Sequence, residues 1–521
     1  MAASLQTLVH LMRLLIFIII IVVLIAHAPA MAAQSKQTSA SDATPGYYFL
    51  LGRHLESKGK IDEAIAAHRR AIELEPESAE LRAELAGLYA RQDRAVEALE
   101  TAEAATKRDP ANREANRILG SIYAAFADQK QPIRRGDDPS QYATRAIASL
   151  EKARGAGAAD LSLELMLGRL YLLTSSFDKA IPPLQRVFEE QPSYTEAAIL
   201  LSSALRSAGR LADATTTLEA ALAENPRSYR AYLQLGELYD DQRRWKDAAA
   251  AYARAQTLNL RADLGARRAA ALINAGDPAQ AMTLLQTTMK RNPERPDPAV
   301  LYLVAHAQRA LKDLDAAAAT AGTLRKLYPD DIRGLYAMAA VYNSKEQYAE
   351  AVGVLKDLIA RAPDDQTIVY QYAHALDKSG RAADAESALR GLLDRDPQDA
   401  NALNSLGYMF AERGERLDEA VELLQRAVKI EPDNPSFLDS LGWAYFRQGK
   451  LDLADGPLAQ AAAKEPDNSV IQDHLGDLRF RQKRFADAIA AWERSLAGDG
   501  DSIDRSAVEK KLRDAQSRVK K

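Results

Sequence analysis

The fold is decided by the stretch Asn434 to Pro466, which reads NPSFLDSLGWAYFRQGKLDLADGPLAQAAAKEP. Leu441 and Tyr445 are four residues apart, so both lie on one face of a helix. Leu458 and Ala461 are three residues apart and mark the apolar face of a second helix. The stretch therefore predicts two amphipathic helices that present their apolar faces to each other.

Small residues allow these two helices to pack closely. Gly442 in the first helix and Ala454 in the second leave room for the two backbones to approach each other. Gly449 permits the turn between the helices, because glycine adopts a positive φ without steric cost. Asn434 followed by Pro435 is typical of the start of a helix. The stretch therefore predicts one complete helix-turn-helix unit.

The same unit recurs along most of the chain. A proline cannot continue a helix, so Pro466 closes the second helix of its unit. Equivalent prolines, most of them 34 residues from their neighbours, are Pro76, Pro110, Pro192, Pro226, Pro293, Pro329, Pro363, Pro397 and Pro432. A period of this length is the signature of helix-turn-helix repeats, and about thirteen units fit into the chain.

The chain resembles the tetratricopeptide repeat over residues 45–502, because its Leu-Gly, Tyr, Gly, Ala, Leu, Ala and Pro positions are in register with that repeat. The Leu-Gly pair of further copies falls at Leu51-Gly52, Leu119-Gly120, Leu167-Gly168, Leu235-Gly236, Leu406-Gly407 and Leu475-Gly476. The resemblance implies an all-α fold, a right-handed superhelical solenoid of about thirteen repeats. It also implies a concave groove lined mainly by the first helix of each repeat.

Two segments depart from the repeat. Gly120 and Ala146 are 26 residues apart, whereas the equivalent pair in the stretch quoted above is 12 apart, so the third repeat carries an insertion near residues 128–142. Such an insertion is either part of a binding face or a tolerated surface loop. After the last repeat, residues 503–521 predict a helix that caps the exposed face of the solenoid.

The composition argues against several classes of function. The chain has 68 Lys and Arg against 72 Asp and Glu, which gives no basic excess for binding nucleic acid. It has no cysteine, and its seven histidines do not fall at metal-ligand spacing. Phosphate-binding loops, His-Glu-x-x-His and Gly-x-Ser-x-Gly motifs are absent from the sequence. We therefore expect no cofactor, no metal, no nucleic-acid partner and no enzymatic activity.

The beginning of the chain has the order of an export signal. Arg13 precedes the unbroken apolar run Leu14 to Ile25, and small residues follow that run. This order predicts a cleaved signal peptide over residues 1–33, with a flexible leader over residues 34–44. If Leu8 to Ala33 forms one segment, it is long enough to remain as an inner-membrane anchor. Either alternative predicts that the repeats lie outside the cytoplasm, in the periplasm or cell envelope of a bacterium.

The groove is predicted from the first helix of each repeat, where the residues between the buried Leu, Gly and Tyr positions point outward. One such position recurs as a ladder of Tyr336, Tyr370, Asn404, Asp439 and Asp473. Beside the ladder lie Tyr408, Trp443, Phe446, Arg447, Phe480 and Arg481. Aromatic faces next to charges are typical of protein contacts, whereas the alternative is that these aromatic residues pack between adjacent repeats. Because the ladder carries two aspartates, an anionic tail is not the favoured ligand.

The block Asn401 to Leu496 contains LNSLGY and LDSLGWAY and is similar to repeat proteins of the bacterial cell envelope. Some members of that group act as adaptors for envelope proteases or for outer-membrane and polysaccharide assembly. The similarity implies an exported scaffold or adaptor that binds a protein or an extended peptide in its groove. The alternative is a structural component of an envelope secretion or polysaccharide-export assembly.

Overall fold

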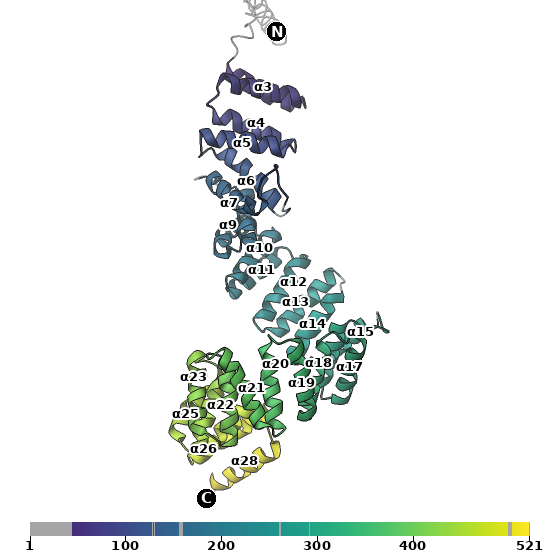
Figure 1. Cartoon of the computed structure of the whole chain (residues 1–521), viewed down its shortest axis with the longest axis vertical. Coiled ribbons are helices and arrows are strands. Elements are labelled where there is room, and N and C mark those ends of the chain that lie inside the picture. Colours follow the sequence, from purple (N-terminus) through teal and green to yellow (C-terminus); the bar gives the residue numbers. More distant parts are fainter. Residues whose placement is uncertain are drawn as a thin grey trace, which may run out of the picture. The chain divides into compact units, whose positions relative to one another are not determined.

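The structure is a computed structural model that describes residues 44–127, 129, 131–155, 160–259, 262–290, 292–498 and 503–519. Every regular element within these ranges is a helix, and Figure 1 numbers the helices along the chain. The chain divides into two compact units between Ala231 and Tyr232. The predicted signal segment over residues 1–33 lies outside the described residues, as does the leader up to residue 43.

The first unit consists of helices that pack in consecutive pairs. They are α2 (Pro45–Ser57), α3 (Ile61–Leu74), α4 (Ala79–Arg91), α5 (Ala95–Arg108), α6 (Arg113–Ala127), α7 (Tyr142–Ala153), α8 (Leu161–Leu173), α9 (Phe177–Glu190), α10 (Thr195–Ser207) and α11 (Leu211–Glu224), with the short 3-10 helix η1 (Pro139–Gln141) before α7. The first helices α4, α6, α8 and α10 also contact one another in order, so successive pairs are stacked.

The second unit continues the same arrangement. The boundary falls within α12 (Tyr229–Asp241). The helices that follow are α13 (Trp245–Leu258), α14 (Ala262–Asn274), α15 (Pro278–Met289), α16 (Pro298–Ala310), α17 (Leu314–Leu327), α18 (Arg333–Ser344), α19 (Tyr348–Arg361), α20 (Gln366–Lys378), α21 (Ala382–Arg395), α22 (Ala400–Arg413), α23 (Leu417–Ile430), α24 (Pro435–Arg447), α25 (Leu451–Lys464), α26 (Ser469–Arg481), α27 (Phe485–Ala497) and α28 (Arg505–Val519). The last helix, α28, buries Val508 and Ala515 against Trp492 of α27.

Apart from α12, which contains the boundary between the units, the described helices from α2 to α27 pack in consecutive pairs, which confirms the predicted all-α repeat solenoid. The pair α24 and α25 folds as its sequence predicts. Asn434 caps α24, because its side-chain oxygen accepts hydrogen bonds from the amides of the second and third helical residues. Leu441, Leu458 and Ala461 are buried.

In several repeats a glycine of the first helix lies against a large side chain of the second helix. A Cβ on Gly442 would lie 2.5 Å from Cγ of Leu458 and 3.1 Å from its backbone nitrogen. Trp492 lies in the same way against Gly476, and the ring of His68 against Gly52. The glycine therefore lets the second helix pack directly onto the backbone of the first.

Polar contacts hold the described part of the third repeat's insertion against α5 and α7. The backbone amide of Ile133 donates a hydrogen bond to the hydroxyl of Tyr142 at 2.7 Å, and Tyr142 is fully buried. Arg134 forms an ion pair with Glu103 of α5 at 2.8 Å. The described part of the insertion therefore packs onto its own repeat and onto the preceding one.

We predict opposite effects from adding one methyl group at two glycines of the second unit. Gly442→Ala should destabilise the unit by about 1–3 kcal/mol, because its Cβ would overlap Leu458. Gly391→Ala should stabilise it by about 0.5–1 kcal/mol, because beyond the adjacent backbone of its own helix nothing in the described chain lies within 4 Å of the new Cβ, and alanine favours helix. Urea unfolding followed by tryptophan fluorescence measures both effects, since all three tryptophans lie in this unit. A neutral Gly442→Ala would show that the helices tolerate a wider separation.

Candidate functional site

The first helices of the last three repeats, α22, α24 and α26, contact one another in order. Their facing residues form one group, which we name the Trp443 cluster. It consists of Tyr408, Glu412, Asp439, Trp443, Phe446, Arg447, His474 and Arg481. The cluster therefore draws residues from three repeats to one place.

Trp443 lies at the centre of the cluster. Its indole stacks with the His474 ring at a centroid distance of 4.0 Å and with the Phe446 ring at 4.8 Å. Its Nε1 donates a hydrogen bond to the Glu412 carboxylate at 3.1 Å. Only 9% of Trp443 is exposed. The indole is thus held in one orientation by contacts from all three first helices.

A buried polar pair lies beneath the indole stack. Nδ1 of His474 is 3.0 Å from the Asp439 carboxylate, and both side chains are buried. Burial alone would lower the pKa of His474, but the Asp439 carboxylate and its acidic neighbours together outweigh burial and raise that pKa above its usual value. Asp473 and Asp477 act in the same direction. The pair therefore favours a protonated histidine that joins α24 to α26.

Two arginines lie against the aromatic rings. The Arg447 guanidinium is 5.9 Å from the centre of the Trp443 ring, and it donates a hydrogen bond to the backbone carbonyl of Glu412 at 2.6 Å. The exposed Arg481 guanidinium is 5.3 Å from the centre of the Phe446 ring. Cations near aromatic faces are attracted to the electron-rich ring. The cluster therefore has cations beside its aromatic rings, and the exposed Glu412 adds a carboxylate to the same group.

Tyr408 lies at the α22 side of the cluster. Burial, together with the Glu412 and Asp439 carboxylates, raises the pKa of the Tyr408 hydroxyl above its usual value. The hydroxyl therefore stays protonated at neutral pH and can act as a hydrogen-bond donor.

The other ladder positions link elements of the solenoid. The hydroxyl of Tyr370 donates a hydrogen bond to the Asp399 carboxylate at 2.6 Å, and that of Tyr336 makes the same bond to Asp365. Asp365 and Asp399 are the N-caps of α20 and α22, so each tyrosine holds the start of the next repeat.

Asp473 and Asn404 differ from these tyrosines. The Asp473 carboxylate accepts a hydrogen bond from Lys511 of α28 at 2.9 Å, and Lys511 also reaches Asp477 at 2.8 Å. Half-buried Asn404 has a side-chain oxygen without a hydrogen-bond partner in the part of the chain that the structure describes. The contact of these residues with a partner protein stays a prediction.

The sequence did not point to Glu412 and His474 of the Trp443 cluster, or to Lys511, which pairs with Asp473. His474 lies about one repeat length after its partner Asp439, and Glu412 lies about one repeat length before its partner Trp443. The 34-residue period was therefore the signal in the sequence that could have pointed to both residues. Lys511 lies beyond the last repeat and had no such signal. Within the described ranges, no cluster of three or more His, Asp or Glu side chains could hold a metal ion.

We predict that the His474–Asp439 pair makes stability depend on pH. Because the folded pKa of His474 is raised, its contribution is complete below the unfolded pKa of about 6.5 and is lost as the pH rises through the folded pKa. The difference in urea midpoint between the wild type and His474→Gln should therefore be larger at acidic than at alkaline pH. Tryptophan fluorescence follows the unfolding.

His374 provides a control of opposite sign. Burial and the nearby Lys378 lower the pKa of His374, so its contribution is complete above the unfolded pKa and is lost as the pH falls below it. The difference between the wild type and His374→Gln should therefore shrink at acidic pH. The same pH trend for both variants would contradict the assignment of the raised pKa to Asp439.

Comparison with known proteins gives the family. Family models described as tetratricopeptide repeat match residues 55–122, 199–263, 272–341, 370–435 and 440–502. These stretches together make up more than half of the chain. The chain therefore belongs to the tetratricopeptide repeat family, as its sequence predicts. Such repeats are scaffolds that bind protein or peptide partners, and the fold is typically non-catalytic.

The chain is similar to a TPR repeat-containing protein of Pseudomonas aeruginosa, with 30% identity over 225 residues. The matched region is 42% of this chain and 32% of the relative, so this chain spans about a third of that protein. Among solved structures, it is similar to a tetratricopeptide repeat protein from Parabacteroides merdae, with a TM-score of 0.42, 16% identity and coverage of 49% of this chain and 98% of that one. It is also similar to a chain in the structure of the APC/C hetero-tetramer Cut9-Hcn1, with a TM-score of 0.41 and 14% identity. That match covers 90% of this chain and 96% of the other chain. The family assignment rests on the sequence matches.

Proposed function

We propose that this chain is an exported scaffold that binds a protein or an extended peptide on the first helices of its last three repeats, at the Trp443 cluster. The observation that carries the proposal is the aromatic cluster around the buried Trp443, which contacts from three repeats hold in place and which Phe446 and Arg481 extend to the surface. Proteins of this family bind partners through their repeats, and the cluster is a chemically suitable place for such contact.

The rigidity of the cluster supports a binding role. Rigid aromatic side chains lose little conformational entropy on binding, and aromatic residues and arginine are enriched among residues that dominate protein interfaces. Trp443 and Phe446 are fixed by stacking, while Arg447 and Arg481 border them. A partner that covers this surface gains apolar contact at the partly exposed Phe446 and polar contact at Arg481.

The choice of variant matters for a test. Trp443 is a poor probe, because it is buried and its loss would disturb the packing of α22, α24 and α26. Arg481 is a better probe, because it is exposed and lies at the edge of the cluster. Arg494 on α27 is a matched control, since it is also an exposed arginine but lies outside the cluster.

We predict that a photo-crosslinking residue at position 481 captures a partner protein in the native cell, whereas the same residue at position 494 does not. Arg481→Glu should weaken co-purification of that partner by about tenfold, as expected for an edge residue of a binding hot spot. Arg494→Glu should leave co-purification unchanged. Equal capture from both positions, or no effect of Arg481→Glu, would place the binding surface elsewhere.

The export part of the proposal rests on the apolar run Leu14 to Ile25 and the small residues after it. Within the described ranges, each helix is too short or too polar to cross a bilayer. We predict that the mature protein begins near Ala30 to Ala33 and is released with the periplasmic fraction, as measured by intact mass and cell fractionation. A full-length mass with membrane association supports the anchor alternative, and recovery in the cytoplasm overturns the proposal.

A further inference from the structure

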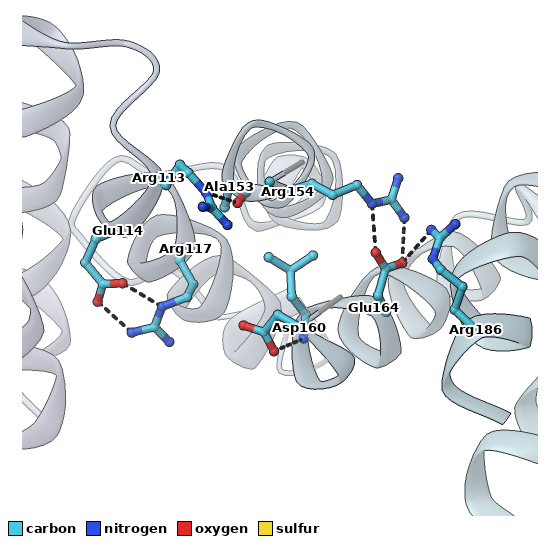
Figure 2. Close-up of a pocket in the computed structure, with 10 residues that line it drawn as sticks. Arg113, Glu114, Arg117, Ala153, Arg154, Asp160, Glu164 and Arg186 are labelled. Carbon is cyan, nitrogen blue, oxygen red and sulfur yellow. Dashed lines mark hydrogen bonds and ion pairs between the residues drawn. The ribbon is translucent and has the colours of Figure 1, made fainter. Parts of the chain in front are cut away.

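The first unit contains an open pocket of about 500 Å³ between the start of α6, the end of α7, the start of α8 and α9. Figure 2 shows four arginines around it, Arg113, Arg117, Arg154 and Arg186. Pockets of this size hold small ligands or single side chains of a partner. The question is which of these guanidinium groups is available to a ligand.

Arg154 and Arg186 are occupied by a carboxylate of the protein. Glu164, with a side chain only 4% exposed, accepts hydrogen bonds from Arg154 at 2.7 Å and from Arg186 at 2.8 Å. Burial raises the pKa of the Glu164 carboxyl, but these two arginines outweigh burial and hold that pKa below its usual range. Glu164 is therefore an anion with two fixed partners, and this side of the pocket is structural.

The opposite side of the pocket is also internally paired. Arg117 donates two hydrogen bonds to the Glu114 carboxylate, at 2.6 and 2.8 Å. The Asp160 carboxylate caps α8 by accepting hydrogen bonds from two backbone amides at 3.0 and 3.2 Å. Each carboxylate in the pocket therefore already has its hydrogen-bond donors.

Arg113 is the exception. Its Nε donates a hydrogen bond to the backbone carbonyl of Ala153 at 3.1 Å, which fixes the side chain over the end of α7 (Figure 2). Its two terminal nitrogens have no hydrogen-bond acceptor within the described part of the chain, and the residue is exposed. Arg117, Arg154 and Arg186 each pair with a carboxylate, and Arg154 also pairs with Glu151 at 3.0 Å. Arg113 has no carboxylate partner among the described residues.

Gly155 makes room for this arginine. A Cβ at Gly155 would overlap the terminal nitrogens and the central carbon of the Arg113 guanidinium. The guanidinium therefore lies directly over the glycine backbone and is held by Ala153 on one side. This arrangement presents the free edge of a fixed guanidinium to the pocket.

We propose that this pocket binds one carboxylate of an extended partner, with the free edge of Arg113 as its receptor. The inference rests on the proposed binding of a protein or peptide, and it adds a second contact of defined chemistry in the other unit. An arginine binds a carboxylate through two parallel hydrogen bonds, which suits the two free nitrogens. Leu163 in the lining can contact the methylene groups next to the carboxylate.

The carboxylates around the pocket favour a ligand with a single negative charge over one with two. A phosphate group carries close to two charges at neutral pH and would face Glu114, Asp160 and Glu164 in the lining, with Glu151 paired to Arg154 beside them. A carboxylate carries one charge, which Arg113 compensates. The acidic side chain of an internal residue and the carboxylate at a chain end both supply this chemistry.

The test uses the full chain and three libraries of short randomised peptides, with binding measured by fluorescence polarisation. The first library has blocked ends and a central Glu, the second has blocked ends and a central Gln, and the third has a central Gln and a free C-terminal carboxylate. The variants are Arg113→Ala, Gly155→Ala and the matched control Arg135→Ala, which removes an exposed arginine outside the pocket lining.

We predict that the wild type prefers a carboxylate-bearing library over the blocked Gln library by about tenfold, the size expected for a hydrogen-bonded charge pair. Arg113→Ala should abolish the preference, and Gly155→Ala should reduce it while leaving helical circular dichroism unchanged. Arg135→Ala should retain it. Preference for the first library identifies a side chain as the source, and preference for the third identifies a chain end.

Two results would overturn the inference: a wild type without any carboxylate preference, and a preference that survives Arg113→Ala. Failure of the Trp443 proposal is distinguishable, because Arg481→Glu tests a residue of the second unit and leaves the first unit unchanged. Carboxylate preference that persists in Arg481→Glu would support this pocket independently of that cluster.

Discussion

The close approach of the two helices in each repeat is the constraint on which the rest of the structure depends. Where Gly442 lies against Leu458, or Gly476 against Trp492, the second helix rests on the backbone of the first. That contact uses the inner face of the first helix, while neighbouring first helices contact one another along the stack. The remaining face of the first helix is therefore free to vary, and its chemistry can differ from repeat to repeat without loss of the fold.

The ladder position illustrates this freedom. In α18 and α20 it is a tyrosine whose hydroxyl holds the N-cap of the next first helix. In α24 it is Asp439, which holds the buried His474 of the following repeat, and in α26 it is Asp473, which holds Lys511 of the terminal helix. In these four repeats the position is a polar link to the next element, whereas Asn404 in α22 has a side-chain oxygen without a hydrogen-bond partner in the described ranges. The residues beside this position, such as Trp443 and Phe446 in α24, differ in type from one repeat to the next.

The fold could be predicted from the sequence because its determinants are local and repeated many times. The shared face of Trp443, Phe446 and Arg447 could be predicted for the same reason, since helical spacing fixes it. The link from Asp439 to His474 could not, because it depends on how one repeat is rotated against the next. The Arg113 pocket was missed because it joins the start of α6 to the end of α7, two points separated by the insertion of the third repeat.

The charged residues at the Trp443 cluster show that the charge offered to a partner depends on the contacts of each side chain as well as on its residue type. Asp439 and Asp473 suggest from the sequence a groove that repels anions. In the structure Asp439 faces the buried His474, and Asp473 shares Lys511 with Asp477, so both ladder aspartates have a partner inside the protein. Arg481, in contrast, is exposed and contacts an aromatic ring. The electrostatic character that a partner meets at the Trp443 cluster is therefore set by the exposed Arg481 together with the exposed Glu412, and the ladder aspartates alone do not determine it.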